Sequence, residues 1–241
     1  MAIEPAHETY PSFVLRWARQ GGHGGRYPVD HPSQPGQPEI EVFMARWAAI
    51  VGARGTGKST HANQVVHLLK RHGICVGGFF QQATEDELGR RSYDLHRLST
   101  GEVLALARPT TGQELPGHTT YCSFSFVDAA FVQARQWVEQ ELGSHPVIVI
   151  DEVSKVEVSG QGHHDAIRCA LGASDDTVVV LCIRADQLFY VVEKFELEDE
   201  AIGLLQLPAS DEDIVAFVTA IAPPNAIDQQ HCSIEPYSSA L

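Results

Sequence analysis

The feature that most constrains this chain is a glycine-rich segment, Gly52-Ala-Arg-Gly-Thr-Gly-Lys-Ser59, which fits the pattern GxxxxGK[ST] at every fixed position. The short apolar run Ala48–Val51 precedes it and predicts a buried strand. Residues 59–71 follow it and repeat apolar side chains at helical spacing, which predicts an amphipathic helix. A strand, a glycine-rich loop and a helix in this order predict an α/β fold.

The residue types in this loop suit the binding of phosphate groups. Gly52, Gly55 and Gly57 allow a sharp turn in which successive N–H groups point inward, and the helix N-terminus adds partial positive charge. We expect Lys58 to reach the β- and γ-phosphates of ATP or GTP, and Ser59 to place its hydroxyl on Mg²⁺. The predicted nucleotide-binding residues are Gly52, Ala53, Arg54, Gly55, Thr56, Gly57, Lys58, Ser59 and Thr60.

A second apolar run, Val147–Ile150, ends in the two acids Asp151 and Glu152. We expect Asp151 to hold Mg²⁺ together with Ser59, and Glu152 to polarise the water that attacks the γ-phosphate. Two consecutive acids favour the P-loop ATPases that use a glutamate base, in which one strand separates the acidic strand from the P-loop strand. The run 178–183 is the candidate for that strand. The residues predicted to carry the catalysis are Glu152, Lys58 and Asp151.

Other side chains are weaker candidates for this site. Arg184 follows the 178–183 run and is a candidate for contact with the γ-phosphate, with an ordinary surface residue as the alternative. Gln81 and Gln82 follow another strand-like run and are candidates for orienting water. His163 and His164 do not predict a metal site, because neighbouring helix positions point about 100° apart.

The rest of the chain alternates strand-like and helical patterns. We expect further strands at 74–80, 91–98 and 102–107, and helices at 128–142, 163–171, 186–195 and 211–221. The turn signal at Gly101 joins two of these strands into an antiparallel hairpin. All-apolar strands that alternate with helices imply a parallel sheet covered on both faces. The predicted fold is therefore a three-layer α/β P-loop NTPase fold, with a mostly parallel sheet flanked by helices and an antiparallel edge hairpin.

The two ends of the chain differ in composition from its middle. Residues 1–42 carry a Gly-Gly-His-Gly-Gly segment and closely spaced prolines, which predict a flexible N-terminal arm. The P-loop NTPase domain is expected at 43–222, and a flexible polar tail at 223–241.

Charge and composition exclude several classes of partner. The chain carries 17 Lys and Arg against 31 Asp and Glu, a net charge of −14, which argues against binding to nucleic acid or anionic membranes. It has neither a long apolar run nor an apolar core in its first residues, so we expect neither a membrane span nor secretion. Its five cysteines form no CxxC pair, which favours a cytoplasmic location without disulfides. A protein partner is neither indicated nor excluded.

Several blocks in order resemble the THEP-type nucleoside-triphosphatases, a family of small P-loop enzymes with a RecA-like core. The resemblance covers residues 48–208 and rests on Ile50–Thr60, Val76–Phe80, Gly89–Arg91, Tyr93–Leu98, Thr100–Glu102, Leu106–Ala107 and Ile148–Glu157. The last block is similar to the family's DEIGPMEL segment. Its Gly-Pro is Ser154-Lys155 here and its Met is Val156, whereas the three acids of the segment remain.

This resemblance implies hydrolysis of ATP, GTP or other nucleoside triphosphates to the diphosphate and phosphate, for which Ser59 and Asp151 predict Mg²⁺ as the cofactor. Two alternatives remain open at this point. A nucleotide or small-molecule kinase shares the P-loop but needs an acceptor pocket and an arginine-bearing lid, for which Arg90, Arg91 and Arg97 are the candidates. A non-catalytic, nucleotide-dependent switch would bind tightly without turnover.

Overall fold

The computed structural model describes residues 45–223 except for 86, 88, 90, 175 and 198–200. The predicted N-terminal arm, 1–42, and residues 224–241 of the predicted tail lie outside this part. The strands are β1 Arg46–Gly52, β2 Val76–Glu85, β3 Arg91–Arg97, β4 Val103–Pro109, β5 His118–Tyr121, β6 Phe124–Val127, β7 Val147–Val153, β8 Val178–Arg184 and β9 Gly203–Gln206. The helices are α2 Lys58–Arg71, α3 Asp128–Glu141, α4 Lys155–Val158, α5 His164–Leu171, α6 Leu188–Lys194 and α7 Asp211–Ile221, with a 3₁₀ turn η1 at Ala185–Gln187.

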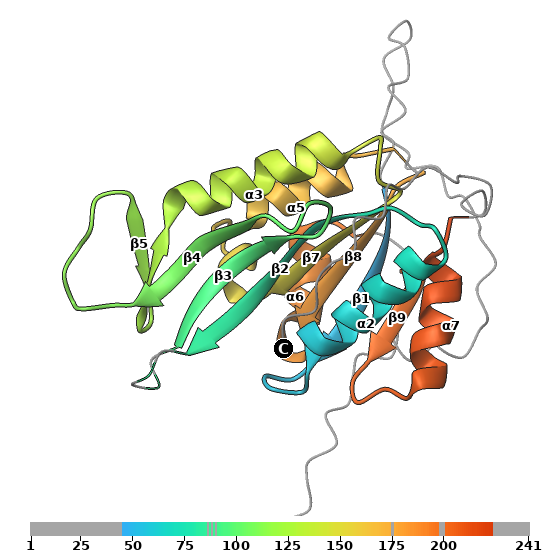
Figure 1. Cartoon of the computed structure of the whole chain (residues 1–241), viewed down its shortest axis with the longest axis horizontal. Helices are drawn as coiled ribbons and strands as arrows, with labels where there is room; N and C mark the ends of the chain where they lie inside the picture. The colour runs from blue at the N-terminus through green and yellow to red at the C-terminus, as the bar shows by residue number, and fades with distance from the viewer. Residues whose placement is uncertain are drawn as a thin grey trace, which may run out of the picture. The chain divides into compact units, whose positions relative to one another are not determined.

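The strands form one mixed sheet in the order β5-β6-β4-β3-β2-β7-β8-β1-β9 (Figure 1). The strands from β2 to β9 in this order are parallel, and β3, β4, β6 and β5 continue the sheet as antiparallel strands. β8 lies between β1 and β7, with Cys182 opposite Ile50 and Leu181 opposite Ile150. The predicted position of the 178–183 strand is therefore confirmed.

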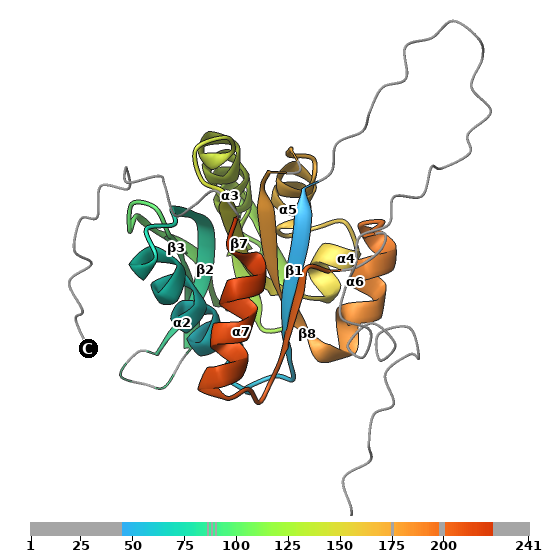
Figure 2. The same cartoon turned by 90° about the vertical axis from the view of Figure 1, so that its right-hand side faces the viewer.

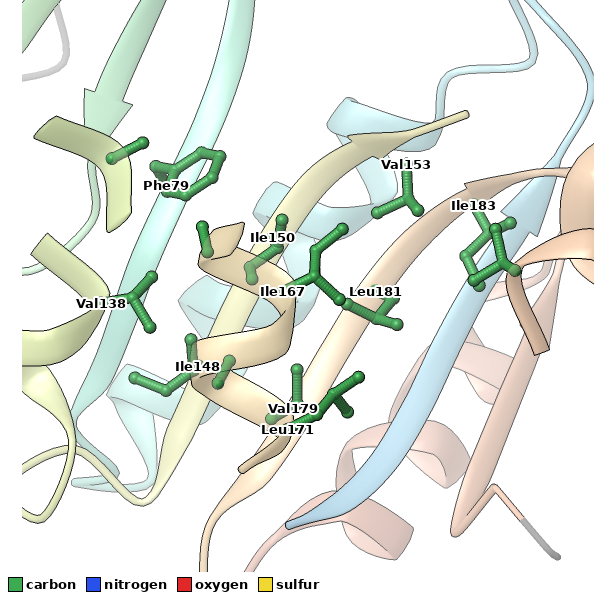
Figure 3. Close-up of a cluster of buried hydrophobic side chains, with 14 of the residues drawn as sticks. Phe79, Val138, Ile148, Ile150, Val153, Ile167, Leu171, Val179, Leu181 and Ile183 are labelled. Atoms are coloured by element: carbon green, nitrogen blue, oxygen red, sulfur yellow. The ribbon is translucent and has the colours of Figure 1, made fainter. Parts of the chain in front are cut away.

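Helices cover both faces of the parallel strands, which confirms the three-layer α/β prediction. α2 and α7 lie on one face, and α3, α5 and α6 lie on the other (Figure 2). Each strand of the middle sheet alternates its side chains between two apolar clusters, as Val149 and Ile150 do in β7. Figure 3 shows part of the cluster beneath α3 and α5, where Ile148, Ile167 and Leu181 meet.

The Gly77-Gly78 pair in β2 makes room for a buried carboxylate from α3. A Cβ on Gly77 would lie 2.6 Å from Glu141 Oε2, and Gly78 has a φ of +92°. Glu141 Oε2 accepts a hydrogen bond from Gly78 N at 2.6 Å, and its Oε1 accepts from Arg97 Nε at 2.7 Å and from Ser99 Oγ. These bonds tie the end of α3 to β2 and to the turn of the β3–β4 hairpin.

The sequence predicted most of these elements but not all. The β3–β4 hairpin and the bounds of α2, α3 and α7 agree closely with the predicted ranges. α7 begins with a capping box, because Ser210 Oγ accepts from Asp213 N at 3.2 Å and Asp213 Oδ2 accepts from Ser210 N at 2.9 Å. The β5–β6 hairpin, α4 and β9 were not predicted. The second hairpin makes β5, and not β4, the edge strand on that side.

Candidate functional site

The glycine-rich loop joins β1 to α2 at the carboxyl edge of the parallel strands (Figure 1). Gly55 has a φ of +78° and Gly57, the N-cap of α2, has a φ of +82°, so both occupy the left-handed region that favours glycine. Thr56 closes a tight turn between them, since its N and its Oγ1 both donate to Ala53 O, at 3.4 and 2.9 Å. Residues 53–56 of the loop therefore form a tight turn before α2.

Glycine is needed at position 52 because neighbouring atoms lie close to it, and not because of an unusual dihedral angle. A Cβ at this position would lie 2.5 Å from Thr56 Oγ1 and 3.1 Å from Leu207 Cβ. Leu207, which follows β9, also donates its N–H to Val51 O at 2.8 Å. The segment after β9 thus packs directly against the start of the loop.

Lys58 is buried although it carries a charge. It is the first residue of α2, is 7% exposed, and donates from Nζ to Ala53 O at 3.3 Å. Its neighbours Ala53, Arg54, Gly55, Ser59 and Thr60 are exposed. The ammonium group consequently lies inside the loop, while the rim of the loop faces outward.

Asp151 brings the acidic strand to the start of α2. Its side chain is 1% exposed, and Oδ2 accepts from Ser59 Oγ at 2.9 Å across 92 residues of sequence. Oδ2 also lies 3.3 Å from Gln81 N, and Oδ1 accepts from Glu152 N at 2.9 Å. Burial of this carboxyl, together with the nearby charge of Glu152, raises the pKa of Asp151 to about 6.

The oxygen atoms of Ser59 and Asp151 fit a magnesium ion. A hydroxyl and a carboxylate in direct contact offer the hard oxygen ligands that Mg²⁺ prefers, and Mg²⁺ in such sites keeps waters and substrate phosphates as its other ligands. Within the described ranges, no group of three or more His, Cys, Asp or Glu side chains could hold a metal ion. A metal here would therefore depend on Ser59, Asp151 and the nucleotide together.

Glu152 has an unusual backbone conformation at the end of β7. Its φ is +60°, in the left-handed region, and the pairing of β7 with β8 shifts register between Ile150 and Val153. The side chain is half-buried, and no described residue donates a hydrogen bond to its carboxylate. Because of the bulge, the Glu152 side chain points in another direction than the side chain of a regular strand residue would. Its carboxylate is therefore available to a ligand.

The weaker candidates near the site have defined contacts. Arg184 ends β8 opposite Gly52, and its Nε and Nη2 donate to the carboxylate of Asp186 at 2.6 and 2.7 Å. Gln81 contributes its main-chain N–H to Asp151, a role that its residue type does not reveal. The suggestion that Gln81 and Gln82 orient water stays a prediction.

Two arginines named for a kinase lid lie in the hairpin and pair with acids there. Arg91 binds Glu85 at 3.0 Å on the surface, and Arg97 binds the buried Glu141 at 2.7 Å. Arg90 lies outside the described residues. The first ion pair therefore joins Arg91 of β3 to β2, and the second joins Arg97 of β3 to α3.

Sequence reasoning assigned no role at the site to two buried groups that lie beside it. Cys182 in β8 is fully buried, and burial together with the nearby carboxylate of Asp151 raises the pKa of its thiol. Glu157 in α4 is 3% exposed and contacts the segment that follows Glu152. The place of β8 beside β7 could have indicated that Cys182 lies near the site. Glu157 was noted only as part of the segment that resembles the family.

Comparison with known proteins agrees with this geometry. A family model described as NTPase matches residues 48–215, which is more than half of the chain. The chain belongs to this NTPase family. The match includes both the glycine-rich loop and the acidic strand of the candidate site.

Two curated relatives share part of the chain. The cancer-related nucleoside-triphosphatase homolog of Mus musculus is 31% identical over 143 residues, which are 56% of this chain and 74% of the relative. Nucleoside-triphosphatase THEP1 of Methanopyrus kandleri is 26% identical over 138 residues, which are 57% of this chain and 74% of the relative. These names agree with the resemblance found in the sequence.

A solved structure supports the fold. The solution structure of a human cancer-related nucleoside triphosphatase is similar with a TM-score of 0.52 and 23% identity, covering 73% of this chain and 95% of that one. In the described part of this family member, no helix is long and apolar enough to cross a membrane.

Proposed function

We propose that this chain is a Mg²⁺-dependent nucleoside triphosphatase that hydrolyses ATP, GTP or a related nucleotide to the diphosphate and phosphate. The observation that carries this proposal is the contact of Ser59 Oγ with Asp151 Oδ2 at 2.9 Å, which joins the phosphate loop to the acidic strand. The names of the relatives, which are nucleoside-triphosphatases, support the same reaction class.

The loop and the start of α2 supply the phosphate site. The main-chain N–H groups of residues 53–59, the N-terminus of α2 and the buried ammonium of Lys58 offer positive charge where the β- and γ-phosphates would lie. Ser59 and Asp151 are the residues that would hold Mg²⁺. When bound, the ion supplies charge stabilisation for the phosphate oxygens.

In this proposal Glu152 acts as the general base. Its carboxylate accepts a proton from a water whose oxygen attacks the γ-phosphorus, while the bond to the β–γ bridging oxygen breaks and the diphosphate leaves. The neighbouring Asp151 accepts three hydrogen bonds and is the acid that would hold Mg²⁺, so Glu152 is the acid that remains for this step. The left-handed conformation of Glu152 supports such a specialised role.

Two substitutions test these roles. We expect Lys58→Ala to abolish nucleotide binding, and Glu152→Gln to retain binding while the rate of phosphate release falls at least about a hundredfold. Phosphate release and equilibrium binding are measured with several nucleoside triphosphates, with and without EDTA. Lys194→Ala and Glu139→Gln are matched controls that change the same residue types on α6 and α3, away from the loop.

The same assay separates the alternatives. Steady phosphate release without an added acceptor supports hydrolysis, release only with an acceptor supports a kinase, and tight binding without release supports a switch. If Glu152→Gln hydrolysed nucleotide at the wild-type rate, the assignment of Glu152 as the base would be wrong.

A further inference from the structure

Glu157 places a buried carboxylate in contact with Ser154, which directly follows the strand that carries Glu152. It lies in the four-residue helix α4, and its side chain is almost fully shielded from solvent. Oε2 accepts from Ser154 N at 2.9 Å and from Ser154 Oγ at 3.3 Å, and Oε1 accepts from His163 N at 3.3 Å. One carboxylate thus joins the end of β7 to the start of α5.

The bulged end of β7, which carries Glu152, is held on both sides. A left-handed conformation costs a residue such as Glu152, which has a Cβ, about 1–2 kcal/mol and persists only where the surroundings impose it. Upstream, the N–H of Glu152 is held by Asp151 Oδ1 at 2.9 Å. Downstream, Val153 pairs with Ile183 of β8, and Ser154 N donates to Glu157.

The residues around Glu157 are tightly packed. Gly162 lies against it with a φ of +64°, and a Cβ there would lie 2.5 Å from Glu157 Oε1. The ring of His163 is buried between Phe79 of β2 and Phe131 of α3, with centroid distances of 4.6 and 4.9 Å. Glu157 is consequently anchored to the core of the domain and not to a surface loop.

An ordinary helix cap does not need such burial. A four-residue helix gains little from a cap alone, and the same carboxylate bears a desolvation cost that raises the pKa of Glu157 to about 7. Ser154 is itself the N-cap of α4 and forms a capping box with Glu157, but a capping box at the surface would not bear this cost. The buried position suits a carboxylate that fixes the main-chain N–H groups around it.

We propose that Glu157 is a positioning residue for Glu152, because its carboxylate holds Ser154 at the end of β7 and, together with the pairing to β8, so aims the Glu152 side chain at the nucleotide. This inference rests on the proposed role of Glu152 as the base. It predicts that Glu157 affects the chemical step only through Glu152, and leaves nucleotide binding by the loop unchanged.

A double-mutant cycle tests this coupling. Glu157→Gln keeps the size of the side chain but cannot accept from Ser154 and His163 at once, so we expect kcat to fall about tenfold or more, with KM and nucleotide affinity changed less than twofold. In the Glu152→Gln background, measured by single-turnover phosphate release, the same substitution is expected to change the rate less than twofold.

Each other outcome has a defined meaning. If Glu157→Gln lowers the rate equally in both backgrounds, or weakens nucleotide binding, Glu157 acts as a general structural residue and the inference is overturned. A wild-type rate for Glu157→Gln beside an inactive Glu152→Gln also overturns it but leaves the proposed function standing. A wild-type rate for Glu152→Gln removes the proposed function itself.

Two further variants keep the test informative. If Glu157→Gln does not fold, Glu157→Asp, which keeps the charge but shortens the side chain by one methylene, is taken through the same cycle with the same expectations. His163→Phe is the matched control, since it keeps the main-chain N–H that bonds Glu157 and the aromatic packing between Phe79 and Phe131. It is expected to retain the wild-type kcat.

Discussion

Three acids near the end of β7 differ in their surroundings, and these differences match separate roles. Asp151 is buried and held by three donors, Glu152 is half-buried with a carboxylate that no described residue bonds, and Glu157 is buried beside the α4–α5 connection. Groups of one chemical type acquire different tasks when burial and hydrogen bonding differ. In the proposed mechanism, metal binding, proton transfer and support of the base are assigned to these three neighbouring positions.

The raised pKa of Glu157 predicts a pH-dependent contribution to stability. Its folded value of about 7 exceeds its usual value of 4.5, so between these values the folded state holds a proton that the unfolded state lacks. This contribution is present below pH 4.5 and is lost as the pH rises through 7. We expect the stability of the wild type relative to Glu157→Gln to fall over this range by roughly 3 kcal/mol at most.

Chemical unfolding of both proteins at several pH values without metal measures this difference. The buried His163, whose pKa burial lowers to about 3, is present in both proteins, so its titration cancels from the comparison. A difference in the free energy of unfolding that stayed constant from pH 4.5 to pH 7.5 would contradict the prediction.

At the residue scale, the sequence predicted the side chains that meet at the site but not the main-chain groups that hold them. Ser59 and Asp151 followed from two local patterns, and the structure brings them into contact. The N–H of Gln81 and the left-handed φ of Glu152 depend on register and on a bulge. Neither leaves a local signal in residue type, so neither could be predicted.

At the scale of elements, the glycine pair in β2 has a testable cost. Gly78 has a φ of +92°, and a Cβ there would lie 2.0 Å from Val149 O in the neighbouring strand. We expect Gly78→Ala to lower the free energy of unfolding by at least about 2 kcal/mol, because backbone strain and a clash with main chain act together. Thermal or chemical unfolding measures the change.

Gly73 provides a matched control for this substitution. Its φ is +76°, but nothing lies within 4 Å of the position of its Cβ, so Gly73→Ala adds the backbone strain without the clash. We expect Gly73→Ala to cost only about 1 kcal/mol. Equal losses for the two variants would show that the contact with β7 does not matter.

The elements that the sequence missed are short or irregular. β5 and β6 have four residues each, and β5, His118–Tyr121, has no buried side chain to give it a pattern. α4 is a single turn stabilised by a tertiary contact with His163. Longer elements such as α3 and β8 were predicted because burial of one face or of both imposes a periodic pattern.

At the scale of the whole molecule, an acidic chain binds an anion through local donors. The net charge of −14 opposes the approach of a nucleotide, while the loop amides, Lys58 and Mg²⁺ would oppose that repulsion locally. We expect Mg²⁺ and ATP at about a hundred times the Kd to stabilise Glu152→Gln by about 2.7 kcal/mol. Thermal unfolding measures this as an increase in Tm.

Removal of the metal is the control for this measurement. EDTA is expected to abolish most of the increase in Tm. Lys58→Ala is expected to show no increase in Tm with ATP, whether Mg²⁺ or EDTA is present. An equal increase in Tm with and without Mg²⁺ would contradict a metal site at Ser59 and Asp151.

The position of β8 between β1 and β7 also dictates when the site can form during synthesis. β1 pairs with β8 and not with β7, although β7 is made earlier. The ribosome adds about 5–20 residues per second, so the loop and α2 wait for seconds until β8 emerges. During that interval the apolar face of α2 has no complete sheet to cover, and a nascent chain of this topology exposes it to chaperones or to aggregation. Nucleotide can therefore act as a folding ligand only after β8 has joined the sheet.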